Sequence, residues 1–190
     1  MTTTTDTFLA ALGVLGQIAI VVILVAGVAA IVSPGVRRAL LGSWGALQVQ
    51  ALWAAWVVAA VATGGSMYFS EIAHYIPCQL CWYQRICMYP LAIVLLVGAL
   101  LRDRRVVLYS MVFPVVGALV SIRHIYIENN PEVESASCRV GAPCSAKYID
   151  EFGYVTIPVL ALTGFVLIGL LLGIVWLAGR RGDASGRSPS

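Results

Sequence analysis

Two cysteines, Cys78 and Cys81, stand three residues apart in the stretch IPCQLCWYQR, residues 76–85. A C-x-x-C pair can serve as a redox dithiol, as a structural bridge or as half of a zinc site. If a helix begins near Cys81, its first-turn N–H groups and positive dipole end favour a thiolate at that residue. Arg85 follows four residues later, which places its guanidinium on the same helix face, one turn deeper. A thiol beside an obligatory cation favours redox chemistry over a purely structural bridge.

A second pair, Cys138 and Cys144, lies in the segment SCRVGAPCSAKY. Five residues separate the two cysteines, and Gly141 and Pro143 supply turn chemistry, so a small disulfide loop can close. We expect this loop to be exposed and its bridge to be exchangeable, which suits attack by the thiolate of another protein. The alternative is a stapled loop that only limits flexibility.

Other interpretations of the cysteines remain. A Cys₄ zinc site is disfavoured, because C-x-x-C with C-x₅-C is poor ligand spacing and the metal would compete with oxidation, so no metal is expected. A structural bridge leaves Arg85 unexplained, although Arg85 by itself is also consistent with a side chain that snorkels to the interface. Cys87 lies among apolar neighbours and is expected to be an inert small hydrophobe.

The composition indicates what must position these residues. The chain has 190 residues, of which 60% are hydrophobic and only 11% are charged, and this predicts a membrane protein. The basic residues lie in short clusters, which argues against a nucleic-acid partner. A span needs about 20 apolar helical residues. Five runs qualify, at residues 8–32, 48–69, 81–101, 106–122 and 154–178, the fourth being short unless it extends to Ile127.

Basic residues sort the loops, because arginine and lysine in short loops mark the cytoplasmic side. With five spans, one face receives Arg37, Arg38, Arg102, Arg104, Arg105, Arg180, Arg181 and Arg187. The other face receives the N-terminus and the segments 70–80 and 123–153. The four cysteines of the two pairs therefore fall outside the cytoplasm, where disulfides persist.

Three segments together resemble the DsbB family of disulfide-bond formation membrane proteins. They are PCQLCWYQR at 77–85, the second cysteine pair, and FGYVTIP at 152–158, which opens the last helix. The closer likeness is to the short BdbC-like branch, whose second pair is closely spaced. The resemblance covers roughly residues 46–178.

The resemblance implies a quinone-dependent protein-thiol oxidase in the bacterial cell membrane. Such an enzyme reoxidises a thioredoxin-fold, DsbA-like partner outside the cytoplasm and passes the electrons to ubiquinone or menaquinone. Carried onto matching positions, Cys138 would form the mixed disulfide with the partner and Cys144 would exchange with Cys78. Cys81 would then face the quinone, with Arg85 beside it. In the enterobacterial type the second pair is widely spaced, so which of its two cysteines meets the partner stays open.

The two histidines are less clearly placed. His124 falls about where the fourth run leaves the membrane, and matches the family only loosely. It is either a solvated surface residue or a hydrogen-bond donor to a quinone carbonyl, and the sequence leaves both open. His74, four residues before Cys78, ranks below it as a residue that tunes that thiol.

The expected fold is all-α. A DsbB-like four-helix transmembrane bundle would occupy residues 46–178, and residues 1–45 would add an external N-terminus, one extra transmembrane helix and a cytoplasmic loop. Residues 179–190 are expected to form a disordered cytoplasmic tail.

Two rival functions remain. A vitamin K epoxide reductase-like enzyme also couples C-x-x-C chemistry to quinones, but its C-x-x-C motif is expected after the other cysteine pair, in the opposite order to this chain. The second rival is a non-enzymatic multi-span protein with structural loop disulfides.

Overall fold

The computed structural model describes residues 4–36, 44–135, 138 and 142–185, and within them the chain forms helices and no strand. The elements are α1 (Thr4–Val32), α3 (Trp44–Glu71), α4 (Gln79–Leu101), α5 (Val106–Ser110), α6 (Val112–Asn129), the 3₁₀ turn η1 (Pro131–Val133) and α7 (Ile157–Ser185). Five segments are long and apolar enough to cross a membrane, and α5 and α6 together supply the fourth, residues 106–129. The predicted all-α fold with five spans is confirmed, including the extension of the fourth run.

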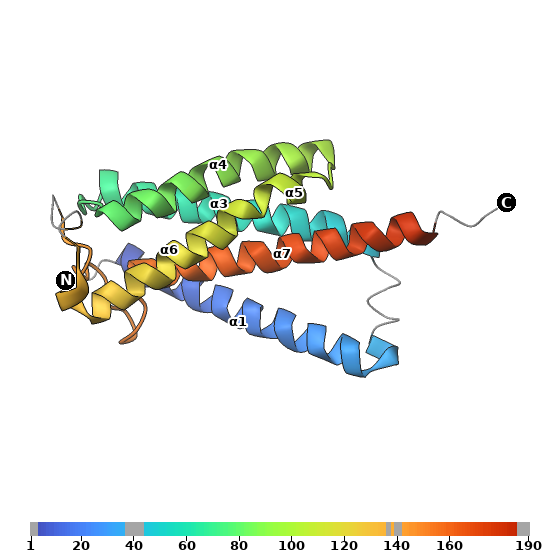
Figure 1. The fold of residues 1–190 in the computed structure, drawn as a ribbon, viewed down its shortest axis with the longest axis horizontal. Coiled ribbons are helices and arrows are strands. Elements are labelled where there is room, and N and C mark those ends of the chain that lie inside the picture. The colour runs from blue at the N-terminus through green and yellow to red at the C-terminus, as the bar shows by residue number, and fades with distance from the viewer. Residues whose placement is uncertain (1–3, 37–43, 136–137, 139–141, 186–190) are drawn as a thin grey trace.

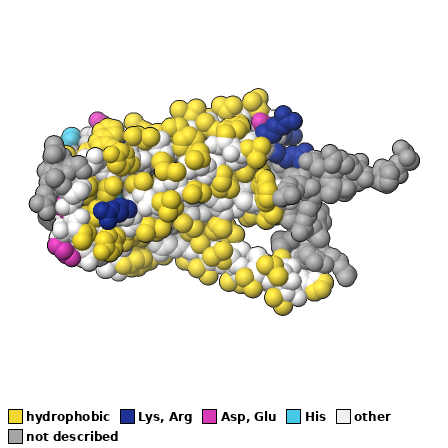
Figure 2. Space-filling view, viewed as in Figure 1, with side chains coloured by type: hydrophobic (Ala, Val, Ile, Leu, Met, Phe, Trp, Pro, Cys, Tyr) yellow, Lys and Arg dark blue, Asp and Glu magenta, His cyan; other side chains and the backbone are white. Residues whose placement is uncertain are grey.

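Helices α3, α4, α6 and α7 pack into a bundle, and α1 lies against the outside of α7 (Figure 1). The first half of α1 is close to the bundle, and its second half diverges from it. The side chains that face outward from the bundle are mostly apolar, as Figure 2 shows along its length. Ile93 is 67% exposed and Leu108 is 72% exposed, which is the expected state of lipid-facing residues.

The bundle core is tightly packed. Leu91 and Leu95 of α4 and Ile168 of α7 are fully buried. Where α6 meets α7, the ring of Phe165 fills the space beside Gly117, and a Cβ atom at Gly117 would overlap that ring. Small residues at such crossings let membrane helices approach closely, so this contact fixes how α6 and α7 lie together.

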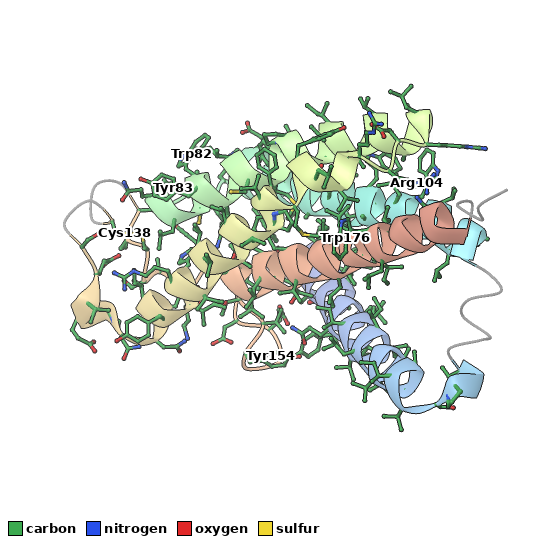
Figure 3. All side chains as sticks on the ribbon, turned by 45° about the vertical axis from the view of Figure 1, so that its right-hand side comes forward. Trp82, Tyr83, Arg104, Cys138, Tyr154 and Trp176 are labelled. Carbon is green, nitrogen blue, oxygen red and sulfur yellow. A yellow bond between two sulfur atoms is a disulfide. The ribbon has the colours of Figure 1, made fainter. Side chains whose placement is uncertain are left out.

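The basic α4–α5 turn and the two cysteine pairs lie at opposite ends of the bundle. The α4–α5 turn exposes three basic residues, Arg102, Arg104 and Arg105. Basic side chains gather at this end in Figure 2, and Arg104 and Cys138 are labelled at opposite ends in Figure 3. The other residues named above for their charge or turn chemistry, Arg37, Arg38, Gly141, Arg187 and the side chains of Arg180 and Arg181, lie outside the described part of the chain.

The C-terminal segment differs from the prediction. Helix α7 continues to Ser185, so the first residues of the tail expected to be disordered from Gly179 are helical. The long apolar helix is already nucleated, and adding a few more helical residues costs little. Residues 186–190 lie outside the described ranges.

Candidate active site at the start of α4

The C-x-x-C motif lies at the N-terminus of α4. The helix begins at Gln79, earlier than the sequence predicted, so Cys78 is the N-cap residue, with an extended backbone at φ −72° and ψ 172°. The backbone N–H of Cys81 donates a hydrogen bond to Cys78 Sγ at 3.3 Å. The two Sγ atoms are 2.9 Å apart. The thiolate favoured by the helix N-terminus is therefore at Cys78, and the expectation that placed it at Cys81 is wrong.

The surroundings of Cys78 stabilise its thiolate. The hydrogen bond from the Cys81 thiol lowers the pKa of Cys78 to about 4, and the hydrogen bond and charge of His124 act in the same direction. Burial opposes the shift, since Cys78 is only 4% exposed. When the pair is reduced, Cys78 is thus ionised at neutral pH.

His124 of α6 lies between the two cysteine segments. It is 3% exposed, so the interpretation of a solvated surface residue is wrong. Its Nε2 atom is 3.6 Å from Cys78 Sγ and 3.1 Å from the carbonyl oxygen of Cys144. His74, in contrast, is exposed in the loop that precedes Cys78.

The second pair forms a disulfide with a Cα–Cα distance of 5.5 Å. Cys138 is 3% exposed and Cys144 is fully buried, so the expectation of an exposed bridge is wrong. The reason is that the bridge packs into one hydrophobic cluster with Cys78, Leu80 and Ile127, at the junction of α4 and α6. The fold thereby brings the two cysteine pairs together.

Carboxylates that the sequence did not assign to the site hold this loop in place. Glu134 accepts hydrogen bonds from the backbone N–H of Ser145 at 3.1 Å and from its hydroxyl at 3.2 Å. Thr156, in the FGYVTIP segment, donates to the buried Glu128 of α6 at 2.8 Å. A signal was present in the sequence, since both carboxylates lie in the acidic segment that carries the second pair.

Arg85 is held by α3. Its Nε donates to Ser66 Oγ at 3.0 Å, and its Nη2 donates to the Ser66 carbonyl oxygen at 3.1 Å and to Ser70 Oγ. The guanidinium carbon also lies 5.3 Å from the ring centroid of Trp82. Ser66 and Ser70 share one face of α3, and this i, i+4 polar pair in an apolar helix is the signal that sequence reasoning missed. The cation is therefore fixed in position at the level of the next helix turn after Cys81.

A cavity of about 450 Å³ opens beside Cys81 and Arg85. Its walls come from α1, α3, α4 and α7 together with loop residues, and most of its lining is apolar. The polar side chains in its wall include Ser66 of α3, Gln84 and Tyr89 of α4, and Thr163 of α7. Neither Cys78 nor His124 lines it. The two cysteines of the motif thus face different surroundings, Cys78 toward the disulfide and Cys81 toward the cavity.

The sulfur atoms of Cys78 and Cys81 and a ring nitrogen of His124 lie within 4.8 Å of one another, a set that can also hold a metal ion. The distinction between metal binding and thiol exchange comes from comparison with known proteins. A sequence profile described as "Disulfide bond formation protein DsbB" matches residues 48–175. The chain belongs to the DsbB family. Disulfide bond formation is the oxidation of thiols, so DsbB family membership makes this chain an oxidoreductase.

Sequence identities to individual proteins support the same family assignment. The chain is 48% identical to disulfide bond formation protein C of Bacillus subtilis (strain 168), over 62% of this chain and 86% of the relative. It is 50% identical to a probable disulfide formation protein C of Halalkalibacterium halodurans, over 60% and 83% of the two chains. A probable disulfide formation protein C 1 of Bacillus anthracis is 43% identical over 67% and 93%. None of the solved structures matches significantly. The predicted likeness to the BdbC-like branch is confirmed.

Proposed function

We propose that the chain is a membrane thiol:quinone oxidoreductase that reoxidises an extracytoplasmic thioredoxin-fold disulfide oxidase. One observation carries this proposal: Cys78 packs against the Cys138–Cys144 disulfide, while Cys81 lines the cavity. A dithiol between a second disulfide and an apolar cavity can take electrons on one side and release them on the other. A structural bridge needs no such arrangement.

The relay consists of thiol–disulfide exchanges. The partner's dithiol reduces the Cys138–Cys144 bridge, and two electrons and two protons move with that exchange. One thiolate of the reduced pair then attacks Cys78 Sγ in the Cys78–Cys81 disulfide, and Cys81 leaves. The second thiolate of the pair attacks the resulting mixed disulfide and releases Cys78, which restores the Cys138–Cys144 bridge.

The low pKa of Cys78 favours this direction of transfer. A thiol of low pKa is a good leaving group in the second exchange. Stabilising the thiolate also stabilises the reduced form of the pair, so the Cys78–Cys81 disulfide becomes a stronger oxidant. His124 contributes as a positioning residue, because its ring contacts both Cys78 and the Cys144 carbonyl.

The residues around the cavity fit a membrane quinone. A quinone bound there accepts two electrons and two protons. Arg85, fixed by Ser66 and Ser70, and the hydroxyl of Tyr89 would hold a polar ring beside Cys81, and the apolar lining would hold its tail. Ubiquinone and menaquinone share this chemistry, and we assign His124 to the cysteine relay instead of to the quinone.

The charge distribution supports one orientation in a bacterial cell membrane. The exposed arginines of the α4–α5 turn favour the cytoplasmic side. The N-terminus and the cysteine segments would then lie outside, where the partner works, and the C-terminus in the cytoplasm.

Sealed membrane vesicles that contain the full chain test the proposal. Reduced thioredoxin-like protein is added from outside, and its thiols and the quinone absorbance are followed in right-side-out and inside-out vesicles. We expect oxidation in the right-side-out vesicles, and a rate lower by about a thousandfold or more after serine replaces Cys78, Cys81, Cys138 or Cys144.

Cys87→Ala is the matched control, because Cys87 is a buried cysteine of the same helix that packs in the bundle core, outside the cluster of the two pairs. Its rate should stay close to that of the unaltered chain. Undiminished turnover in any of the four serine variants, or turnover only in inside-out vesicles, contradicts the scheme.

A further inference from the structure

Helix α1 precedes the segment that matches the DsbB family, which begins at residue 48. It nevertheless forms part of the cavity beside Cys81. The α1 residues in the cavity wall are Leu9, Leu12, Gly13, Leu15, Gly16 and Ala19. They occupy the half of α1 that lies close to the bundle in Figure 1, while beyond residue 20 most of its side chains are exposed.

Close packing against α7 holds this half of α1 in place. A Cβ atom at Gly13 would overlap Leu160 Cδ2, and one at Gly16 would lie 3.0 Å from Thr163 Cγ2. A residue as large as leucine at either position would therefore have to displace Leu160 or Thr163, or move α1 away from α7. Gly27, in the diverging half, has nothing within 4 Å of an added Cβ. The glycines of the docked half thus set the position of the cavity wall.

Hydrogen bonds at both ends of the docked half add specificity to this packing. The hydroxyl of Tyr154 donates to Gln17 Oε1 at 2.9 Å, and Gln17 Nε2 donates to Thr163 Oγ1 at 3.4 Å. Figure 3 shows Tyr154 beside α1. Near the start of α1, the Tyr75 hydroxyl donates to Asp6 Oδ2 at 3.4 Å. Polar contacts between membrane helices fix their register, so α1 is attached to the loops that surround the site.

The cavity lining is mostly apolar and includes a small number of polar side chains. Cys81, Arg85 and Ser66 are among the polar ones, whereas α1 contributes only leucine, glycine and alanine to the wall. A ligand with this distribution has a small polar ring and a long hydrocarbon tail. Its ring would lie next to Cys81 and its tail along α1.

We propose that the docked half of α1, residues 9–19, binds the isoprenoid tail of the quinone and so makes this enzyme selective for long-tailed acceptors. This inference rests on the proposed function, because it assumes that the cavity receives the quinone. The proposal gives α1 a function in binding the quinone tail, in addition to the part of the cavity wall that α3, α4 and α7 provide.

Photolabelling tests the placement directly and does not depend on turnover. The full chain is reconstituted with a quinone whose isoprenoid tail ends in a photoreactive group, irradiated, and mapped by peptide mass spectrometry. We expect label on residues 9–19. Label confined to α3, α4 and α7 overturns the inference, and so does labelling of residues 9–19 by a photoreactive phospholipid but not by the quinone, which identifies the occupant as an acyl chain.

A variant series tests selectivity. In Gly13→Leu we expect the ratio of KM for a long-tailed quinone to KM for a tail-less analogue to rise about tenfold, the discrimination that one or two buried methylene contacts provide. In the same variant, the amount of quinone photolabel on residues 9–19 should decrease. Gly27→Leu, the same substitution on the same helix, should keep the original ratio.

Tyr154→Phe removes only one hydroxyl and keeps the test valid if Gly13→Leu does not fold. It should raise the KM ratio less, by about twofold. If the KM ratio is unchanged in both Gly13→Leu and Tyr154→Phe while quinone reduction is normal, the inference about α1 is overturned and the proposed function still stands. Failure of the unaltered chain to reduce either quinone contradicts the proposed function as well.

Discussion

Replacing Cys81 with serine is expected to stop quinone reduction and to trap a disulfide between Cys78 and one cysteine of the second pair. The exchange that forms this mixed disulfide needs only Cys78, which lies in the same buried cluster as Cys138 and Cys144. In this variant the Cys78 thiolate attacks the oxidised Cys138–Cys144 bridge, which forms the mixed disulfide and releases one cysteine of the pair as a thiolate. No Cys81 thiol remains to attack Cys78 Sγ and complete the transfer to a Cys78–Cys81 disulfide. Turnover should fall by about a thousandfold or more, as for loss of a nucleophile.

Peptide mass spectrometry under non-reducing conditions measures the trapped species and shows whether Cys138 or Cys144 forms it. The control is Cys78→Ser, which keeps Cys81, the cysteine that lines the cavity, so the trapped link should be absent if only Cys78 exchanges with the second pair. The contradicting result is a disulfide from Cys81 to Cys138 or Cys144 in the Cys78→Ser variant, at the level seen for Cys78 in Cys81→Ser. It would show that Cys78 and Cys81 are interchangeable, against the assignment of Cys78 to the second pair and of Cys81 to the quinone.

The second large effect concerns ionisation. In the reduced chain, Cys78 should remain a thiolate as the pH falls from 9 to about 5, because its pKa is lowered to about 4. An ordinary cysteine, with a pKa near 8.5, is ionised only to about 3% at pH 7. Restoring an ordinary pKa would therefore reduce the reactive fraction of Cys78 at pH 7 about thirtyfold.

Two substitutions should raise the pKa of Cys78 to different extents. Cys81→Ala removes the hydrogen bond that is the largest cause of the lowering, and His124→Phe removes a smaller one, so the first should raise it more. The ultraviolet absorbance of the thiolate, corrected with Cys78→Ser, reports the titration. A wild-type midpoint at the ordinary value, or no change in either variant, contradicts this account of the site.

The same shift predicts the pH dependence of stability in the reduced chain. Between pH 4 and about 8.5 the unfolded state binds a proton at Cys78 that the folded state does not. The contribution of Cys78 to the free energy of unfolding is thus complete above the ordinary pKa. It is lost progressively as the pH falls to about 4, and Cys78→Ser should lack this dependence.

The spans could be predicted from the sequence because their signal is local. Uncharged apolar runs of membrane length must form helices, since no other backbone structure satisfies its hydrogen bonds in lipid short of a closed barrel. The C-x-x-C motif and Arg85 were likewise recognisable by spacing along one helix.

The features that the sequence did not reveal all depend on contacts between distant segments. The burial of His124 and of the Cys138–Cys144 bridge follows from packing of the loop onto α4 and α6. The assignment of the thiolate to Cys78 depended on where α4 begins, and a shift of two residues changes which sulfur caps the helix. Periodicity cannot show that α1 docks on α7, because the apolar residues of α1 are spread around the whole helix and form no separate face.

A single-turnover experiment tests the central claim, that Cys78 and Cys81 deliver electrons to a membrane quinone. The full chain is reduced, freed of reductant without oxygen, and mixed with one equivalent of quinone, while quinone absorbance and the thiol state of each cysteine are measured together. The account predicts that one quinone is reduced for each disulfide formed, that this disulfide forms first at Cys78–Cys81 before it passes to Cys138–Cys144, and that no quinone is reduced in Cys81→Ser. Persistence of both thiols beside unreacted quinone, or equal quinone reduction in Cys81→Ser, would contradict it.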